Sequence, residues 1–309
     1  MISLSKLREL NLADAGDAGL PRHLSAASGL ACLGSFIYVV ADDELHLGVF
    51  PATDRTPGRL IRLFDGELPM TKAARKKQKP DLEAIAQLPA FGNYPNGALL
   101  ALGSGSEQNR RRSALLGTDA QGALSGAPRT VDCSQLFAVL DRHFPALNIE
   151  GAIAVGGELL LLQRANKRHP RNAIARYPLS AVLDALHSGA PVGAIAPSAI
   201  DAVDLGSIGE VPLGFTDGAS LPDGGMVFTA VAEDTADTYN DGTCLGAAIG
   251  LLASDGTLRC LDRIDGPHKV EGVAARVDGN VIRLLLVTDA DDPALPASLF
   301  GATIPNAAG

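Results

Sequence analysis

Glu271-Gly272-Val273-Ala274 is one of five versions of a short pattern, and the recurrence of this pattern along the chain decides the fold. Each version begins with a polar residue, a carboxylate in four of the five, and continues into small and apolar residues. The other versions are Ser28-Gly29-Leu30-Ala31, Glu83-Ala84-Ile85-Ala86, Glu150-Gly151-Ala152-Ile153 and Asp217-Gly218-Ala219-Ser220. Consecutive versions lie 55, 67, 67 and 54 residues apart. Units that recur at a nearly fixed period predict a repeat architecture.

Each repeat predicts a small antiparallel sheet of about four short strands. In the second repeat, Asn96-Gly97 separates two apolar runs, which is a strong hairpin signal. Repeated four-stranded sheets favour an all-β fold, a β-propeller. A β-sandwich of similar length would not explain why a carboxylate recurs at each repeat. We therefore expect a single domain over residues 1–309 with five four-stranded blades, six blades being the alternative.

The fifth repeat is incomplete, because the chain almost ends after the segment Leu299 to Ile304. Lys6 to Leu12 has one apolar face and can supply the missing outer strand. Such an exchange would pair a strand edge that is otherwise open. We expect helices only in two inserts, Ser134 to Phe144 and Ser180 to His187. The basic clusters are expected in loops: Lys72 to Lys79, Arg110 to Arg112 and Arg164 to Arg171.

Composition restricts the class of protein. Of the 309 residues 46% are hydrophobic and 20% are charged, which is typical of a globular protein with a large core. The formal net charge of −9 argues against a general nucleic-acid partner. No run approaches the ~20 apolar residues that span a membrane, and residues 1–20 contain no apolar signal core. We therefore expect a cytoplasmic protein with reduced thiols, whose oligomeric state the sequence does not fix.

Propeller geometry predicts where the polar residues gather. Successive strands of a blade alternate in direction, so the start of strand one and the loop between strands two and three share a rim. The strand starts bring Glu83, Glu150, Asp217 and Glu271 to the mouth of the central channel. The loops add Ser104, Ser106, Arg111, Arg164 and Asn166 at the same mouth.

These carboxylates have two interpretations. They can cap backbone N–H groups of the neighbouring blade as a repeated structural device. Alternatively, four carboxylates around one channel repel one another unless a cation compensates, and their oxygens suit Ca²⁺. On the second interpretation Glu83, Glu150, Asp217 and Glu271 are both metal ligands and catalytic residues. A small anionic substrate would then be bound by the loop residues Arg164, Arg111, Asn166, Ser104 and Ser106.

Several motifs resemble those of the phytase-like β-propeller group, bacterial proteins with esterase-like activity or of unknown function. They are Asp81-Leu-Glu-Ala-Ile-Ala86, Gly103-Ser-Gly-Ser106, Asn148-Ile-Glu-Gly151, Gln163-Arg-Ala-Asn166, Gly214-Phe-Thr-Asp-Gly218, Ala230-Val-Ala-Glu233 and Lys269-Val-Glu-Gly-Val-Ala274. The resemblance covers most of the chain from about Asp81 to Ile304. It implies a propeller hydrolase, and relatives with phytase activity have six blades and use Ca²⁺ to bind phosphate.

The function predicted from these observations is metal-assisted hydrolysis of a phosphoester or carboxylic ester at the channel mouth. The alternative is a non-catalytic propeller that binds a small anionic ligand or a protein partner at the same face. A lactonase-like enzyme with a metal in its channel is a third possibility. The sequence contains no phosphate-binding loop of the G-x-x-x-x-G-K-[ST] type, no H-E-x-x-H and no G-x-S-x-G elbow.

Overall fold

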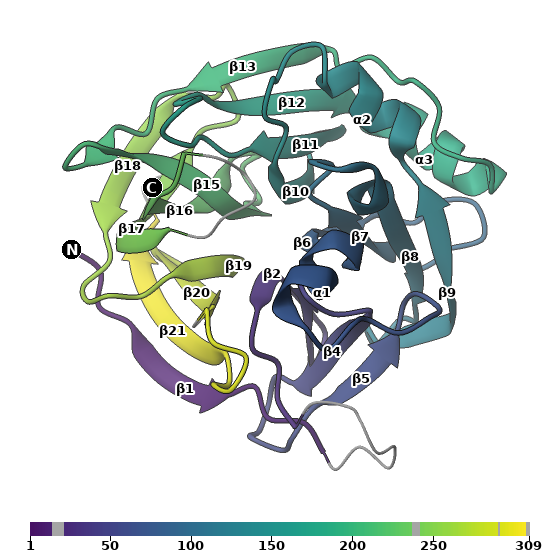
Figure 1. Ribbon diagram of the computed structural model, residues 1–309, viewed down its shortest axis with the longest axis horizontal. Helices are drawn as coiled ribbons and strands as arrows, with labels where there is room; N and C mark the ends of the chain where they lie inside the picture. Colours follow the sequence, from purple (N-terminus) through teal and green to yellow (C-terminus); the bar gives the residue numbers. More distant parts are fainter. Residues whose placement is uncertain (14–21, 237–241, 290, 307–309) are drawn as a thin grey trace.

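Five antiparallel sheets stand in a ring around a central channel, so the chain folds as a five-bladed β-propeller (Figure 1). The computed structural model describes residues 1–13, 22–236, 242–289 and 291–306. The innermost strands of the five blades are β2, β6, β10, β15 and β19 (Figure 1). The predicted all-β class and the predicted five blades are confirmed.

The strands follow one another outward within each blade. Blade 1 consists of β2 (Ala27–Leu33), β3 (Phe36–Ala41), β4 (His46–Pro51) and β5 (Arg59–Arg62). Blade 2 consists of β6 (Leu82–Leu88), β7 (Ala98–Gly103), β8 (Arg112–Thr118) and β9 (Leu124–Asp132). Blade 3 consists of β10 (Ile149–Val155), β11 (Glu158–Gln163), β12 (Asn172–Pro178) and β13 (Ala199–Val203).

Blade 4 contains β15 (Val211–Ser220), β16 (Met226–Asp234), β17 (Thr243–Leu252) and β18 (Leu258–Arg263), and the short strand β14 (Ser207–Ile208) is added beside β15. Blade 5 contains β19 (Val270–Asp278), β20 (Val281–Thr288), β21 (Ser298–Pro305) and, as its outer strand, β1 (Ser5–Glu9).

The hydrophobic core lies between the faces of neighbouring blades. Between blades 1 and 2, for example, Tyr38 and Leu47 pack in one cluster with Leu99. In blades 1 to 4 the second strand is covered on both faces, which explains apolar runs such as Leu159 to Leu162 in β11. Each blade is thus stabilised mainly by its two neighbours.

Strand β1 closes the ring, as predicted. It pairs antiparallel with β21, with Ser5 opposite Gly301 and Glu9 opposite Ser298. It begins one residue before the start of the predicted segment Lys6 to Leu12 and ends three residues before the end of that segment. The chain upstream of β1 also joins blade 4, because the Ile2 N–H donates to the Arg263 carbonyl at 2.8 Å. The first residues therefore bond to both of the last two blades.

The described part of the chain contains three α-helices. The two predicted inserts form α2 (Ser134–Leu140) and α3 (Leu179–Ser188). The first basic cluster, expected in a loop, forms α1 (Lys72–Gln78), because Ala, Lys, Arg and Gln are good helix formers. The second cluster was also expected in a loop and lies in the 3₁₀ helix η1 (Gln108–Arg111). No helix in the ranges that the structure describes is long and apolar enough to cross a membrane.

A β-bulge interrupts every innermost strand, near its start in four blades and in the middle of β15 in blade 4. The register with the second strand shifts there, so that residues on the inner strand are left without a partner across the pair. The unpaired residues are Ser28 with Gly29, Glu83, Glu150, Thr216 and Glu271. In three blades the bulge therefore coincides with the recurring carboxylate.

Candidate functional site

The innermost strands and the rim loops enclose a cavity of about 90 Å³ at one end of the channel. All five blades contribute to its lining, as the predicted convergence of strand starts and loops requires. Its charged residues are the carboxylates Asp42, Asp81, Glu83, Glu150, Glu233, Glu271 and Asp289 and the cations Lys76, Lys79, Arg110, Arg164 and Lys269. Ser28, Asn148, Ala165, Asn166 and Thr235 complete the lining.

One side of the cavity is formed by the Lys79 cluster, which we define as Asp42, Lys79, Asp81, Glu83 and Arg110. The Lys79 ammonium contacts Asp42 Oδ2 and lies 2.8 Å from Asp81 Oδ1. Arg110 Nη1 donates to the other oxygen of Asp81 at 2.9 Å. Asp42 comes from the β3–β4 loop, whereas Asp81 and Glu83 begin β6. The cluster therefore joins blades 1 and 2.

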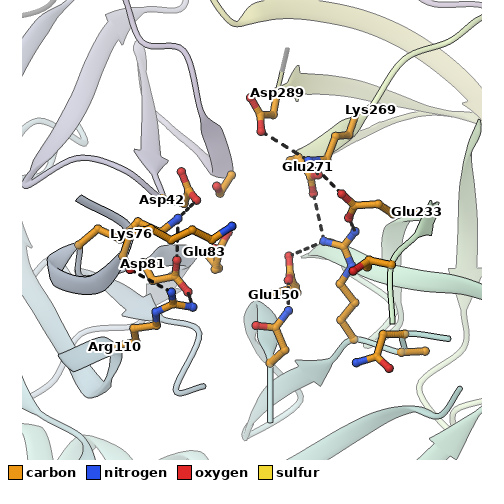
Figure 2. A pocket seen from close by; sticks show the side chains of 17 residues that line it. Asp42, Lys76, Asp81, Glu83, Arg110, Glu150, Glu233, Lys269, Glu271 and Asp289 are labelled. Atoms are coloured by element: carbon orange, nitrogen blue, oxygen red, sulfur yellow. Dashed lines mark hydrogen bonds and ion pairs between the residues drawn. The ribbon is translucent and has the colours of Figure 1, made fainter. Parts of the chain in front are cut away.

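The opposite side is formed by the Arg164 cluster, which we define as Glu150, Arg164, Glu233, Lys269 and Glu271. Figure 2 shows the carboxylates of the two clusters facing each other across the cavity. Arg164 donates to Glu150 at 3.2 Å and to Glu233 at 2.6 Å, and its Nη1 lies 3.9 Å from Glu271. Lys269 lies 3.6 Å from both Glu233 and Glu271. This cluster joins blades 3, 4 and 5.

Negative charge exceeds positive charge at the cavity. Seven carboxylates and five cations line it, so the lining carries a formal charge of −2 when every group is ionised. Each cation of the two clusters already contacts at least one carboxylate. Glu83 makes no hydrogen bond or ion pair to another described residue. The site as it stands can therefore take up protons or another cation more readily than an anion.

Burial raises the pKa of two facing glutamates. The pKa of Glu83 is raised well above its usual value by burial and then by repulsion from Glu150, Asp81 and Asp42. Burial raises the pKa of Glu150 to about 8, although attraction to Arg164 opposes the change. At neutral pH a pKa of about 8 leaves Glu150 mostly protonated, and the raised pKa of Glu83 favours its protonated form as well.

The buried cations Lys79 and Arg164 also have raised pKa values, but the cause is attraction to carboxylates and not burial. Burial by itself would lower the pKa of Lys79, but attraction to Asp42, Asp81 and Glu83 outweighs burial and raises it. In the same way carboxylates outweigh burial at Arg164, whose pKa is also raised. Both side chains stay charged at any physiological pH, so the cavity wall always carries these two positive charges.

Asn166 offers an unused hydrogen-bond donor at the cavity wall. Its Oδ1 accepts from the backbone N–H groups of Arg168 at 3.0 Å and His169 at 2.8 Å. Its Nδ2 is buried and has no hydrogen-bond partner among the described residues. Buried donors are rarely left unpaired, so this amide suits a bound molecule that carries an acceptor.

The sequence pattern of one protein family matches residues 23–304, which is most of the chain. The chain belongs to this family. Its description is "Family of unknown function (DUF6929)". The narrower resemblance to phytase-like propellers is not part of this match and stays a prediction. A comparison with curated proteins found no match.

Solved structures of similar shape share little sequence with the chain. Glutaminyl cyclase from Myxococcus xanthus is 10% identical with a TM-score of 0.49, and the match covers 98% of this chain and 97% of that one. Mannose phosphorylase from Leishmania mexicana is 14% identical with a TM-score of 0.45, covering 98% and 89%. Arabinanase from Bacillus subtilis is 13% identical with a TM-score of 0.39, covering 91% and 94%. Likeness at this level says nothing about the reaction.

Of the predicted catalytic acids, Glu83, Glu150 and Glu271 line the cavity and Asp217 does not. Asp217 is 1% exposed, and its Oδ2 accepts from the backbone N–H groups of Val273 at 2.9 Å and Leu30 at 3.4 Å. Thr216, and not Asp217, is the bulged residue of blade 4. The repeat is therefore offset by one residue in this blade, and Asp217 has the capping role that was the alternative interpretation.

Only some of the predicted substrate-binding residues line the cavity. Arg164 and Asn166 line the cavity. Arg111 forms an ion pair with Asp141 at 3.0 Å instead, while its neighbour Arg110 reaches the cavity. Successive residues of a 3₁₀ helix point about 120° apart, which separates the two side chains.

Ser104 and Ser106 support the site from behind. Ser104 is fully buried and donates to Asp81 Oδ2 at 2.6 Å. Ser106 accepts from Arg110 at 3.0 Å. Neither serine is part of the cavity lining, so both hold charged residues in place.

Sequence reasoning did not single out several residues of the site. Asp42, Glu233 and Asp289 lie on the rim that the strand order predicts, so their location could be inferred but not their pairing. Lys269 stands two residues before Glu271, and Lys79 stands four residues before Glu83. Both lysines therefore come shortly before an innermost strand, a position that was available in the sequence.

The predicted Ca²⁺ ligands do not form one group. Among the described residues, the carboxylates with oxygens within 4.8 Å of one another are Asp42, Asp81 and Glu83, so only Glu83 of the predicted set belongs. Oxygen donors of this kind suit Ca²⁺. However, the Lys79 ammonium already bridges Asp42 and Asp81. With Lys79 in this position the group does not fit a resident Ca²⁺.

Proposed function

We propose that this protein is a hydrolase that binds a small uncharged ester in the cavity and cleaves it with Glu83 and Glu150. One observation carries the proposal: the buried Glu150 and the partly buried Glu83 both have raised pKa values and face the same small polar cavity, but they have different partners. Acid–base catalysis needs one group that holds a proton and one that can accept it.

The partners of the two glutamates assign their roles. Glu83, without a hydrogen-bond donor or ion-pair partner among the described residues, holds the proton of the pair. Glu150 accepts hydrogen bonds from Arg164 and Asn148, and these donors stabilise its ionised form. A pKa of about 8 in the folded protein makes Glu150 an effective base near neutral pH.

The reaction then follows from these roles. Glu150 accepts a proton from a water molecule whose oxygen attacks the carbonyl carbon of the ester. The bond from this carbon to the leaving oxygen breaks, and Glu83 gives its proton to that oxygen. The products are a carboxylic acid and an alcohol, and solvent returns the proton from Glu150 to Glu83. Asn166 Nδ2 offers a hydrogen bond to the substrate.

The charge and size of the cavity support a small substrate without net charge. With Glu83 protonated and Glu150 ionised, as this reaction requires, an anion would meet six ionised carboxylates and five cations. Arg164 is already engaged by Glu150, Glu233 and Glu271. This favours a carboxylic ester or lactone over the anionic substrate that the sequence predicted. A volume of about 90 Å³ admits only a small group, since drug-sized ligands need roughly 300 Å³ or more.

The test is a substrate panel with matched variants. We expect turnover of p-nitrophenyl acetate and a small lactone, none of p-nitrophenyl phosphate, and no loss of turnover in EDTA. Glu83→Gln and Glu150→Gln should each lower kcat/KM by about 100-fold or more. Glu210→Gln, which changes an exposed acid that is not part of the cavity lining, is the control.

Three outcomes would contradict the proposal. Turnover that persists in both cavity variants would remove the acid–base pair. Turnover that requires Ca²⁺ would favour metal-assisted hydrolysis. Saturable ligand binding without turnover of any ester would favour the non-catalytic binding module.

A further inference from the structure

Asp42, Asp81 and Glu83 are arranged as a cation-binding group. Their oxygens lie within 4.8 Å of one another, a separation at which one ion can contact all three. Three carboxylates this close repel one another strongly when no positive charge lies between them. The fold brings them together from two blades, so all three can be ionised together only when enough positive charge lies among them.

Lys79 supplies that positive charge. Its side chain is buried, and its ammonium contacts one oxygen of Asp42 and, at 2.8 Å, one oxygen of Asp81. Attraction to all three carboxylates is strong enough to overcome the cost of burying the ammonium. The ammonium thus lies between Asp42 and Asp81, two of the three carboxylates that a divalent ion in this group would contact.

The backbone around Lys79 is fixed on both sides. Upstream, its N–H donates to the Arg75 carbonyl at 2.8 Å, and Arg75 is bound to Asp43 and Glu44 of the β3–β4 loop. Its own carbonyl accepts from Asn109 at 2.8 Å. Downstream, Asp81 has a φ of 56°, a conformation that non-glycine residues rarely adopt. These contacts tether the ammonium to the carboxylate group.

We propose that Lys79 is a tethered cation that takes the place of a divalent metal ion in the Asp42, Asp81 and Glu83 group. The wild-type protein therefore has no use for Ca²⁺ at this position. Removal of the ammonium converts the three carboxylates into a site for Ca²⁺ or Mn²⁺. The inference concerns charge and geometry and does not depend on the proposed hydrolysis.

The experiment measures binding of Ca²⁺ and Mn²⁺ by isothermal titration calorimetry to full-length protein, without any substrate. Lys79→Met should bind either ion at least 100-fold more tightly than the wild type, and the ion should raise its melting temperature. Adding Glu83→Gln to Lys79→Met should remove most of this gain, which locates the ion.

Two control variants separate the effect from general loss of positive charge. Lys79→Arg keeps the charge and should gain no affinity. Lys167→Met removes a half-exposed lysine that pairs with Asp234 at 2.5 Å, outside the cavity, and should also gain none. If Lys79→Met is purified only as aggregate, Lys79→Gln is refolded with and without Ca²⁺ instead. The yield of folded protein is then measured, and Ca²⁺ should raise it.

Two binding results would contradict the role of Lys79 as a tethered cation. A wild-type protein that binds Ca²⁺ at micromolar concentration, or a folded Lys79→Met protein that binds neither ion at millimolar concentration, contradicts it. Loss of esterase activity in Glu83→Gln, by contrast, bears only on the proposed function.

Discussion

Three glutamates that share one sequence pattern acquire different charge partners at the cavity. Glu150 contacts Arg164 and Asn148, and Glu271 lies near Lys269 and Arg164. Glu83 forms no ion pair with a described residue and has the longer-range attraction of Lys79 and Arg164. The pattern places these residues, but the partner that each finds depends on loops from other blades. Their chemistry therefore differs although their positions in the repeat are equivalent.

The raised pKa of Glu150 makes stability depend on pH in an unusual direction. Between the unfolded pKa of about 4.5 and the folded pKa of about 8, the folded state holds a proton that the unfolded state has lost. Stability should therefore fall as pH rises through this window and level off above it. Thermal melts from pH 5 to 9 should show this slope reduced in Glu150→Gln, with Glu210→Gln unchanged. Identical slopes in all three proteins would mean that Glu150 ionises normally.

Arg164 should be important for stability as well as for the site. Removing it leaves Glu150, Glu233 and Glu271 buried with much less positive charge, and breaking a buried pair costs about 3–5 kcal/mol. Urea unfolding of Arg164→Met should show a loss of that order. Arg283→Ala, which removes an exposed pair with Asp278, should cost no more than about 1 kcal/mol. Equal losses in the two variants would contradict the burial argument.

At the scale of the element, a β-bulge in each innermost strand sets which residue is left without a partner, and in blades 2, 3 and 5 this residue reaches the cavity. Glu83, Glu150 and Glu271 occupy bulges, and Thr216 occupies the bulge of blade 4. The sequence predicted the innermost strands and their common rim from the apolar runs and the recurring acid. It could not predict the offset at Asp217, because both residues of Thr216-Asp217 are polar and a bulge leaves no period of its own.

Glycine after the bulge lets neighbouring innermost strands approach closely. A Cβ on Gly272 would lie 2.8 Å from the Ser28 carbonyl oxygen, closer than van der Waals contact allows. Gly272→Ala should therefore lower the free energy of unfolding by about 1–3 kcal/mol. Gly193→Ala, where a Cβ meets no atom within 4 Å, is the control and should change stability little. Chemical denaturation of both variants decides the matter, and equal stabilities would show that the strands can move apart freely.

At the scale of the whole molecule, ring closure joins the two ends of the described chain. This feature was predictable, because the last repeat lacked an outer strand and the N-terminal segment had one apolar face. The charge pairs of the cavity were not predictable to the same degree. They join loops from different blades, and the sequence gives the order of blades but not the contacts between side chains across the channel.

Deleting residues 1–12 should expose the edge of β21 and remove the hydrogen bond from the Ile2 N–H to the Arg263 carbonyl. We expect a loss of several kcal/mol, a large share of the ~5–15 kcal/mol that stabilises a typical domain. Differential scanning calorimetry should show a melting temperature lower by ~10 °C or more. A synthetic peptide of residues 1–13 added in excess should restore part of the loss. An unchanged melting temperature would show that β1 adds nothing to closure.

The pairing of β1 with β21 also imposes an order on biosynthesis. Strand β1 leaves the ribosome first, and its partner follows about 290 residues later. At ~5–20 residues per second, β1 waits roughly 15–60 s for the strand it must join. A nascent chain arrested before Ser298 cannot complete its fifth blade, however well the earlier blades have formed. Residues of β21 are therefore needed before β1, translated much earlier, can take its place in the sheet.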